Sequence, residues 1–184
     1  VDEVFECARS LRSEKYLYIR NYHPHLSHNQ PSVFSDLGRT RQEITRLARD
    51  KPQLLDKAQL DYAGPGKPVE AFYDCEVDPH NLVNLLETEM TAKQQAALVE
   101  HRRIYRMERR RLRDPGAIPE SEMWKWVRNE DKALRDILLG KSDHQPNLEA
   151  AWSAADLVGR SKVPTALKLL KSADPSERYW AILA

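Results

Sequence analysis

The N-terminal part of the chain shows the period-two alternation of side chains that is typical of β-strands. The alternation is clearest from Tyr16 to Tyr22, where tyrosine and arginine positions alternate with leucine, isoleucine and asparagine. A preceding strand is predicted from Phe5 to Arg12, and residues 13–15 form the turn between the two. Pro24 ends the ladder because proline has no backbone N–H to donate. These residues predict a β-hairpin.

Residues 26–69 show no sustained period and are predicted to be mostly loop with short helical patches. The best patch is Arg41–Asp50, whose apolar positions fall on one helix face. A short strand is predicted at Glu70–Tyr73. Asp78 followed by Pro79 joins a preferred N-cap to a preferred first helical residue, so we expect a short helical turn to begin there.

The rest of the chain carries helical periodicity. Thr91 with Gln94 is a capping-box pattern, which opens a predicted long helix ending at about Arg113. A second helix is predicted from Pro119 to about Leu139, with Trp124 on its buried face.

Three shorter helices are predicted near the C-terminus. Asn147 and Asp174 are expected to cap two of them, and residues 163–170 repeat the same apolar spacing. Helices at intervals of roughly 30 residues, each with one apolar stripe, are typical of stacked helical hairpins. The whole pattern predicts an α+β fold, with a small antiparallel β-sheet packed with helices over residues 1–90 and an all-helical segment over residues 91–184.

Composition narrows the functional classes. The 184 residues include 29 Lys and Arg against 28 Asp and Glu, and this balance argues against a dedicated nucleic-acid binder. No apolar run is long enough for a membrane span, and no signal peptide opens the chain. With only 6 Gly and no Gly-rich phosphate motif, nucleotide binding is not expected.

Two further features concern the chain as a whole. The two cysteines, Cys7 and Cys75, form no disulfide framework, and the sequence does not decide whether they pair with each other. The chain begins at Val1 and ends within an apolar-periodic stretch, so we expect it to be a piece of a longer protein.

Two clusters were considered as metal sites. Asp74, Glu76 and Asp78 alternate like the start of an EF-hand loop, but the glycine and glutamate that such a loop needs are absent. The favoured interpretation is structural, with Asp74 closing a strand and Asp78 capping a helix. His23, His25 and the nearby His28 are more typical of a loop that is solvated or faces a ligand than of a metal site. We therefore predict no metal site and no cofactor in this chain.

An arginine stripe is the third candidate. Arg102, Arg106, Arg109 and Arg113 fall on one side of the predicted long helix and could bind an anion such as sulfate or phosphate. Acidic residues dilute the stripe, so a solvated face is the favoured interpretation. No spacing indicates an oriented nucleophile and base, so no catalytic residue is assigned.

Two segments taken together resemble type I, formylglycine-dependent sulfatases. Residues 8–22 resemble the C-terminal hairpin of that family. Residues 70–85 resemble its strand-to-helix signature E-L-Y-D-L-x-x-D-P-x-E-x-x-N-L. Phe72, Cys75 and Asn81 stand where that signature has Leu, Leu and Glu, and in this alignment its first Glu falls on Ala71, one position after Glu70. The similarity is nearest to the bacterial heparan N-sulfatase-like branch, and the helical tail resembles the HEAT-like extension that some members carry.

This resemblance implies a C-terminal subdomain whose catalytic domain lies outside the chain. Formylglycine and a calcium ion would belong to that N-terminal domain, which would be the partner of this chain. The expected substrate is a sulfated carbohydrate, and a periplasmic or secreted location is inferred from the family. By the same resemblance, four residues at the end of the second strand are predicted to contact substrate, namely Arg20, Asn21, His23 and His25. The alternative is that they belong to a plain surface loop.

Three other functions stay open. The helical segment could be a non-catalytic scaffold for protein interaction, or the arginine stripe could bind an anion or nucleic acid. The chain could also belong to a related phosphodiesterase or phosphonate hydrolase of the alkaline phosphatase superfamily.

Overall fold

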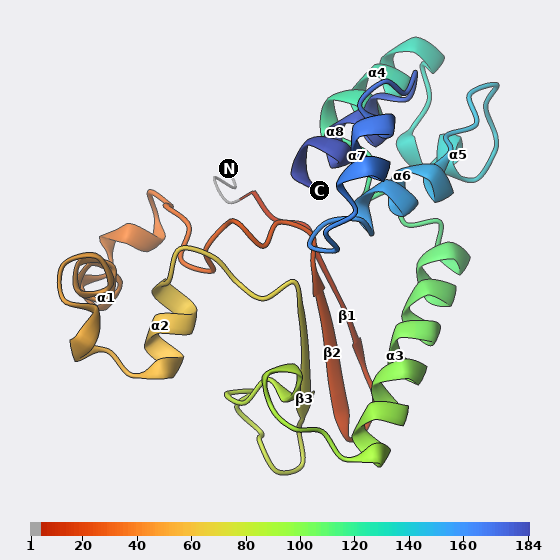
Figure 1. Ribbon diagram of the computed structural model, residues 1–184. Helices are drawn as coiled ribbons and strands as arrows, with labels where there is room; N and C mark the ends of the chain where they lie inside the picture. Colours follow the sequence, from red (N-terminus) through yellow and green to blue (C-terminus); the bar gives the residue numbers. More distant parts are fainter. Residues whose placement is uncertain (1–4) are drawn as a thin grey trace. The chain divides into compact units, whose positions relative to one another are not determined.

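The computed structural model describes residues 5–184 (Figure 1). The chain divides into two compact units, and the boundary along the sequence falls between His101 and Arg102. The first unit contains a small antiparallel sheet, and the second is helical. The predicted α+β class is confirmed. Among the described residues, no helix has the length and apolar character that crossing a bilayer requires.

Three strands make up the sheet of the first unit, in the order β1-β2-β3. Strand β1 is Ala8–Arg12, β2 is Tyr16–Asn21 and β3 is Glu70–Asp74. All pairings are antiparallel, so the predicted hairpin and the third strand are present. The first strand begins at Ala8 rather than Phe5, although the Cys7 carbonyl still accepts from the Tyr22 N–H (2.9 Å).

The tyrosine face of β2 is the buried one. Tyr16 and Tyr18 are buried, whereas Leu17 and Ile19 on the other face are half-buried. The Tyr16 and Phe72 rings stack with centroids 5.0 Å apart. This aromatic face therefore supplies the core of the first unit.

Helix α3, Ala92–Arg111, brings its first turns to this aromatic core. The His101 ring lies edge-on to Tyr16 and Phe72, at 6.0 and 5.4 Å. Its Nδ1 lies 2.7 Å from the Ala97 carbonyl and its Nε2 lies 3.1 Å from the Ser13 hydroxyl. Because a carbonyl only accepts, Nδ1 carries a proton in the contact with Ala97. The predicted capping box is confirmed, since the Gln94 N–H donates to Thr91 Oγ1 (3.3 Å) and the Thr91 N–H to Gln94 Oε1 (2.8 Å).

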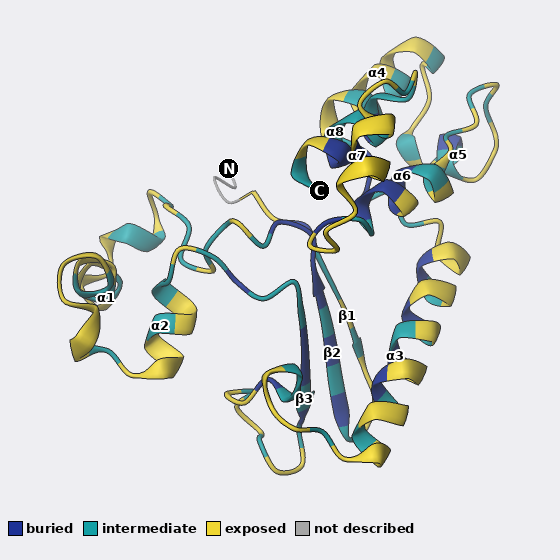
Figure 2. Cartoon of the chain, in the orientation of Figure 1, coloured by how far each residue is buried: buried dark blue, intermediate teal, exposed yellow. Residues whose placement is uncertain are grey.

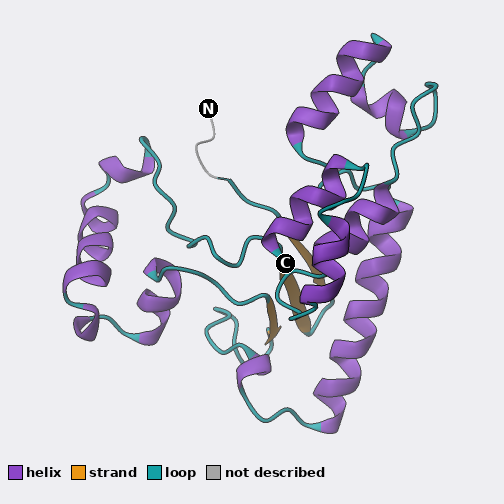
Figure 3. Cartoon of the chain, turned by 45° about the horizontal axis from the view of Figure 1, so that its top comes forward, coloured by secondary structure: helices purple, strands orange, loops and turns teal. Residues whose placement is uncertain are grey.

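An arm of short helices connects β2 to β3. It holds α1, Arg39–Asp50, and α2, Lys57–Ala63, with single turns of 3-10 helix at Ser35–Leu37 and Pro52–Leu54. The predicted patch at residues 41–50 is confirmed and starts two residues earlier. No residue from 24 to 66 is fully buried (Figure 2). Long stretches of loop flank the helices (Figure 3).

The prediction of a helical turn that begins at Asp78-Pro79 is wrong. The Asp78 carboxylate instead accepts from the backbone N–H of Val83 (2.8 Å), which closes a wider turn. Asn81 within this turn has φ 55°, a left-handed conformation incompatible with a helix. The only helical turn nearby is the 3-10 helix at Leu85–Glu87. The same preference of aspartate for backbone N–H groups thus closes a loop here rather than starting a helix.

The second unit holds the rest of α3 and the shorter helices that follow it. Their bounds are α4, Glu120–Glu130; α5, Leu134–Leu138; α6, Leu148–Ala155; α7, Val163–Leu169; and α8, Pro175–Leu183. The caps predicted at Asn147 and Asp174 are confirmed, because their side chains accept from the N–H groups of Ala150 and Ser176.

The single helix predicted from Pro119 to Leu139 is wrong. It is two helices, α4 and α5, because Asp131 adopts a left-handed conformation (φ 49°) and ends the first. Ile137 is fully buried as the apolar spacing suggests, but Trp124 is 53% exposed.

Tryptophan and arginine organise the core of the second unit. The indole N–H groups of Trp152 and Trp180 donate to the carbonyls of Asp114 (2.8 Å) and Ala117 (2.6 Å). The Arg109 guanidinium donates to both Asp156 oxygens (3.1 and 3.0 Å) and lies 4.4 Å from the Trp152 ring. This ion pair joins α3 to the segment after α6. Because Arg109 is buried, water screens the pair only weakly.

Replacing Arg109 should therefore destabilise the second unit. Arg109→Ala leaves the Asp156 carboxylate without its buried partner, which we expect to cost about 3 kcal/mol in the free energy of unfolding. Urea denaturation followed by tryptophan fluorescence measures this unit selectively, because all four tryptophans follow residue 102. Arg111→Ala, which removes an exposed pair with Glu108, is the control and should change the free energy by less than about 0.5 kcal/mol. Equal effects of the two variants would contradict this account.

Candidate functional site

The four residues predicted to contact substrate lie at the end of β2 and just after it. The Arg20 guanidinium donates to the Val69 carbonyl (3.1 Å), and the Asn21 side-chain amide donates to the Pro68 carbonyl (2.7 Å). Both side chains are buried. These two hydrogen bonds join the end of β2 to the segment that leads into β3.

The histidines beyond them differ in accessibility. His23 is buried, with its ring 4.7 Å from Phe5 and 5.8 Å from His25. Burial, with a smaller contribution from the neighbouring His25, lowers the pKa of His23 to about 4. His23 is therefore neutral at physiological pH. His25 is exposed, so of these four residues only His25 presents its side chain to solvent.

The segment before β3 makes close backbone contacts with this loop. The Lys67 N–H donates to the Pro24 carbonyl (2.9 Å), and the buried Lys67 ammonium pairs with Glu6. A Cβ atom at Gly66 would lie 2.7 Å from the Pro24 carbonyl oxygen, so only glycine allows this close approach. The loop that carries His23 and His25 is consequently held by backbone contacts from the β3 side.

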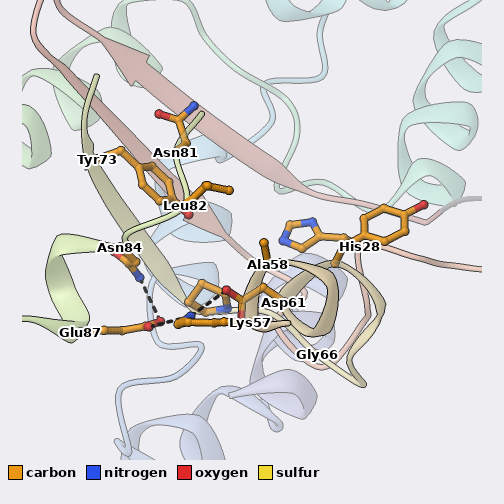
Figure 4. Close-up of a pocket in the computed structure, with 12 residues that line it drawn as sticks. His28, Lys57, Ala58, Asp61, Gly66, Tyr73, Asn81, Leu82, Asn84 and Glu87 are labelled. Atoms are coloured by element: carbon orange, nitrogen blue, oxygen red, sulfur yellow. Dashed lines mark hydrogen bonds and ion pairs between the residues drawn. The ribbon is translucent and has the colours of Figure 1, made fainter. Parts of the chain in front are cut away.

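A separate pocket of about 230 Å³ lies between the arm and β3 (Figure 4). Residues from five segments of the first unit line it. They are His28, Lys57, Ala58, Asp61, Tyr62, Gly66, Pro68, Tyr73, Asn81, Leu82, Asn84 and Glu87. In the close-up, Tyr73 and Leu82 lie on one side and His28 on the other.

A charge network crosses this pocket. The Lys57 ammonium lies 2.7 Å from the Asp61 carboxylate and 3.4 Å from the Glu87 carboxylate. These two partners raise the pKa of Lys57, so its amine stays charged. Burial, followed by the charges of Glu87 and Asp61, raises the pKa of Tyr73, so its phenol stays protonated.

The Asn84 side-chain amide connects this network to β3. Its Oδ1 accepts from the N–H groups of Phe72 (2.9 Å) and Leu86 (3.2 Å). Its Nδ2 donates to the carbonyl of Glu70 (3.2 Å) and to Glu87 Oε1 (3.4 Å). Phe72 and Glu70 belong to β3, so the buried Asn84 amide takes the place of a further strand along the outer edge of β3.

Other polar groups of the pocket are not engaged in this way. Within residues 5–184, the Tyr73 hydroxyl, the Asn81 Nδ2 and the His28 ring make no hydrogen bond with the protein. These groups come from β3, the turn after it and the loop after β2.

This pocket is not predicted from the sequence. Its residues are far apart in the chain, and α2 was predicted only as part of a mostly irregular region. One signal was present, because Asp56 and Gln59 form a capping box at the start of α2 and Lys57 and Asp61 are spaced for an i,i+4 ion pair.

The acidic cluster and the arginine stripe are both neutralised in part. Lys15 pairs with Asp74 (3.2 Å) and Glu76 (2.5 Å), and no group of three or more possible metal ligands occurs among the described residues. On the stripe, Arg109 pairs with Asp156, while the adjacent Arg110 pairs with Glu149 (2.5 Å). Neither Cys7 nor Cys75 forms a disulfide bond in the structure.

Comparison with known proteins adds one relative. The Ulvan-active sulfatase of Formosa agariphila is 30% identical to this chain over 122 residues. Over that stretch the chain is similar to a sulfatase. The match covers 66% of the chain and 20% of the relative, so the chain spans about one fifth of the length of the protein it matches. No protein-family profile matches the chain, and no solved structure matches it significantly.

Removing the Asn84 amide should destabilise the sheet. Asn84→Ala leaves the edge groups of β3 without partners, and we expect a loss of about 2–3 kcal/mol in the free energy of unfolding of the first unit. Asn84→Asp should also destabilise it, because a carboxylate cannot donate to the Glu70 carbonyl. The Tyr18 amide resonance during urea titration reports this unit. Gln42→Ala, on the exposed face of α1, is the control and should have an effect below about 0.5 kcal/mol; a similarly small effect of both Asn84 variants would refute the edge role.

The low pKa of His23 predicts a specific pH dependence of stability. Below the unfolded-state pKa of 6.5, the unfolded chain binds a proton at this site that the native state does not bind until about pH 4. Native stability therefore falls as pH is lowered through that window. Between about pH 7.5 and pH 5 the loss attributable to His23 should be roughly 2 kcal/mol.

Urea titrations of the unsubstituted chain and of His23→Gln at both pH values measure this loss. The variant lacks the titrating group, so its stability should fall less over the same range. His80→Gln, an exposed histidine, should retain the full pH dependence of the unsubstituted chain. An identical pH dependence in His23→Gln would show that His23 does not cause it.

Proposed function

We propose that this chain is the C-terminal portion of a formylglycine-dependent sulfatase that hydrolyses sulfate esters or sulfamates of sulfated glycans. The observation that carries the proposal is the 30% identity to a sulfatase over 122 residues. The hairpin and the segment from Glu70 to Leu85 resemble that family, and backbone pairing of β2 with β3 joins them in one sheet. Asn84, from the same segment, bonds to the outer edge of β3. In this proposal the catalytic groups belong to an N-terminal domain outside the chain.

The exposed face of the sheet supports docking of such a domain. Helix α3 packs at the tyrosine face of β2, and the opposite face presents Leu17 and Ile19, both half-buried. Half-exposed apolar side chains on a sheet face are stabilised when another layer covers them. The N-terminal domain is the partner we assign to this face.

The chemistry divides between the two parts. Formylglycine and calcium, expected in the N-terminal domain, would supply the nucleophilic oxygen and the charge that stabilises sulfate oxygens. The loop after β2 would form one wall of the catalytic pocket of the N-terminal domain, and His25 would contact the substrate there. Arg20, Asn21 and His23, which are buried, would act by holding this loop. A periplasmic or secreted location forms part of the same proposal.

A scaffold function is the second candidate. Helices α7 and α8 expose apolar side chains, with Val163 and Leu167 each 56% exposed and Ile182 74% exposed. Such side chains favour contact with another protein surface. A scaffold without a catalytic domain would release no sulfate from any substrate, which separates it from the sulfatase proposal.

The direct test is sulfate release by the longer protein that contains this chain. Sulfated polysaccharides serve as substrates, with phosphate diesters and phosphonates assayed in parallel. Sulfate release that needs both the upstream domain and this chain would support the proposal. Faster cleavage of phosphodiesters or phosphonates would favour the related hydrolases, and no activity on either class would favour the scaffold.

The role of His25 can be tested in the same longer protein. His25→Ala should lower kcat/KM on the sulfated polysaccharide by about tenfold, the loss typical of one hydrogen bond to a charged group. The effect should be small on a minimal aryl sulfate, which is too short to reach the loop. His80→Ala is the matched control, since His80 is also exposed but lies in the turn after β3. Unchanged kinetics of His25→Ala on the polysaccharide would remove this residue from the site.

A further inference from the structure

The pocket between the arm and β3 is the feature of the first unit that the proposed function leaves unused. Its volume of about 230 Å³ lies below the range of roughly 300–1,000 Å³ that is typical of drug-sized ligands. A ligand that fills it is therefore about the size of one small ring with its substituents.

The polar groups of the pocket match hydroxyl groups. A hydroxyl both donates and accepts hydrogen bonds, so it is best bound where acceptors and donors converge. Asp61 and Glu87 are acceptors, Asn81 Nδ2 is a donor without a protein partner within residues 5–184, and the Tyr73 hydroxyl can do both. The left-handed backbone at Asn81 (φ 55°) is a conformation that asparagine tolerates better than most residues.

Aromatic and apolar surface accompanies these groups. Tyr73, Tyr62 and His28 contribute rings, and Leu82 and Pro68 contribute aliphatic surface (Figure 4). Such a lining suits a ligand that has C–H groups as well as hydroxyls, because a polar network alone gains little by displacing water.

The charge of the pocket restricts the ligand further. Two carboxylates, Asp61 and Glu87, share the single ammonium of Lys57, which leaves one net negative charge. The carboxylates of Asp61 and Glu87 would repel a sulfate or carboxylate group on the ligand.

From these observations we infer that the pocket binds a neutral, unsulfated sugar ring. The choice of a sugar among polyhydroxyl ligands rests on the proposed function, whereas the exclusion of anionic groups follows from the pocket itself. In a longer glycan, this site would select an uncharged residue at a fixed place along the chain, while sulfate is recognised elsewhere.

The test is an NMR titration of the 184-residue chain, labelled with ¹⁵N. The probes are the methyl glycosides of glucose, galactose, xylose and rhamnose, and methyl glucoside 6-sulfate. At least one neutral glycoside should shift the amide resonances of Tyr73, Asn81 and Leu82 saturably, with a Kd in the millimolar range expected for so small a ligand. The sulfated glycoside should bind at least about tenfold more weakly than methyl glucoside.

Variants connect the binding to the lining residues. Tyr73→Phe and Asn81→Gly should each weaken binding of the neutral glycoside by about fivefold, since each removes one hydrogen bond and glycine keeps the left-handed backbone of residue 81 accessible. The double variant Asp61→Asn with Glu87→Gln should reduce the difference in Kd between the neutral and the sulfated glycoside, because it removes both carboxylates from the pocket. Glu43→Gln removes an exposed carboxylate on α1, outside the pocket, and should change neither affinity.

Several outcomes would overturn the inference. They are the absence of saturable shifts with all neutral glycosides, shifts confined to other parts of the chain, and equal or tighter binding of the sulfated glycoside. Because this assay needs no catalysis, its failure is separable from failure of the sulfatase proposal. A longer protein that releases sulfate while the chain binds no neutral sugar would leave the proposed function standing and this inference refuted.

Discussion

The outer edge of β3 is the constraint on which much of the first unit depends. A three-stranded sheet leaves the backbone groups of its last strand exposed, and such groups must find partners or remain open to other chains. Here one side-chain amide, that of Asn84, accepts from Phe72 and donates to Glu70. The same amide fixes the 3-10 turn that follows and orients Glu87. One asparagine therefore joins a strand edge, a turn and the wall of a pocket.

The two candidate sites of the first unit differ in how accessible their side chains are. Around His23, the polar groups are buried and bonded to backbone carbonyls, so they set the path of the loop and leave His25 as the exposed group. In the pocket beside β3, the charged groups are exposed and paired through Lys57. In the proposed function the two regions have separate roles, because the buried groups fix the position of the loop and the exposed groups remain available to a ligand.

The features predicted correctly from sequence are those specified by neighbouring residues. Alternation predicted the strands, and the caps at Thr91, Asn147 and Asp174 lie where their side chains indicate. The errors arose where local chemistry permits two outcomes. Asp78 can cap a helix or close a turn, and Asp131 ends α4 without the glycine or proline that usually marks such a break. The pocket was not predictable because it forms only when α2, β3 and residues 81–87 meet in the folded chain.

The arm from residue 24 to residue 66 has a consequence for motion. An element that contributes no fully buried residue opens at a small cost in free energy, well before the sheet unfolds. Its amide hydrogens will exchange with solvent through such local openings. Because α2 supplies Lys57 and Asp61, each opening also removes these two residues from the wall of the pocket. Binding of the inferred sugar would therefore require the arm to be closed, and it would slow the exchange of α2 amides while leaving those of β2 unchanged.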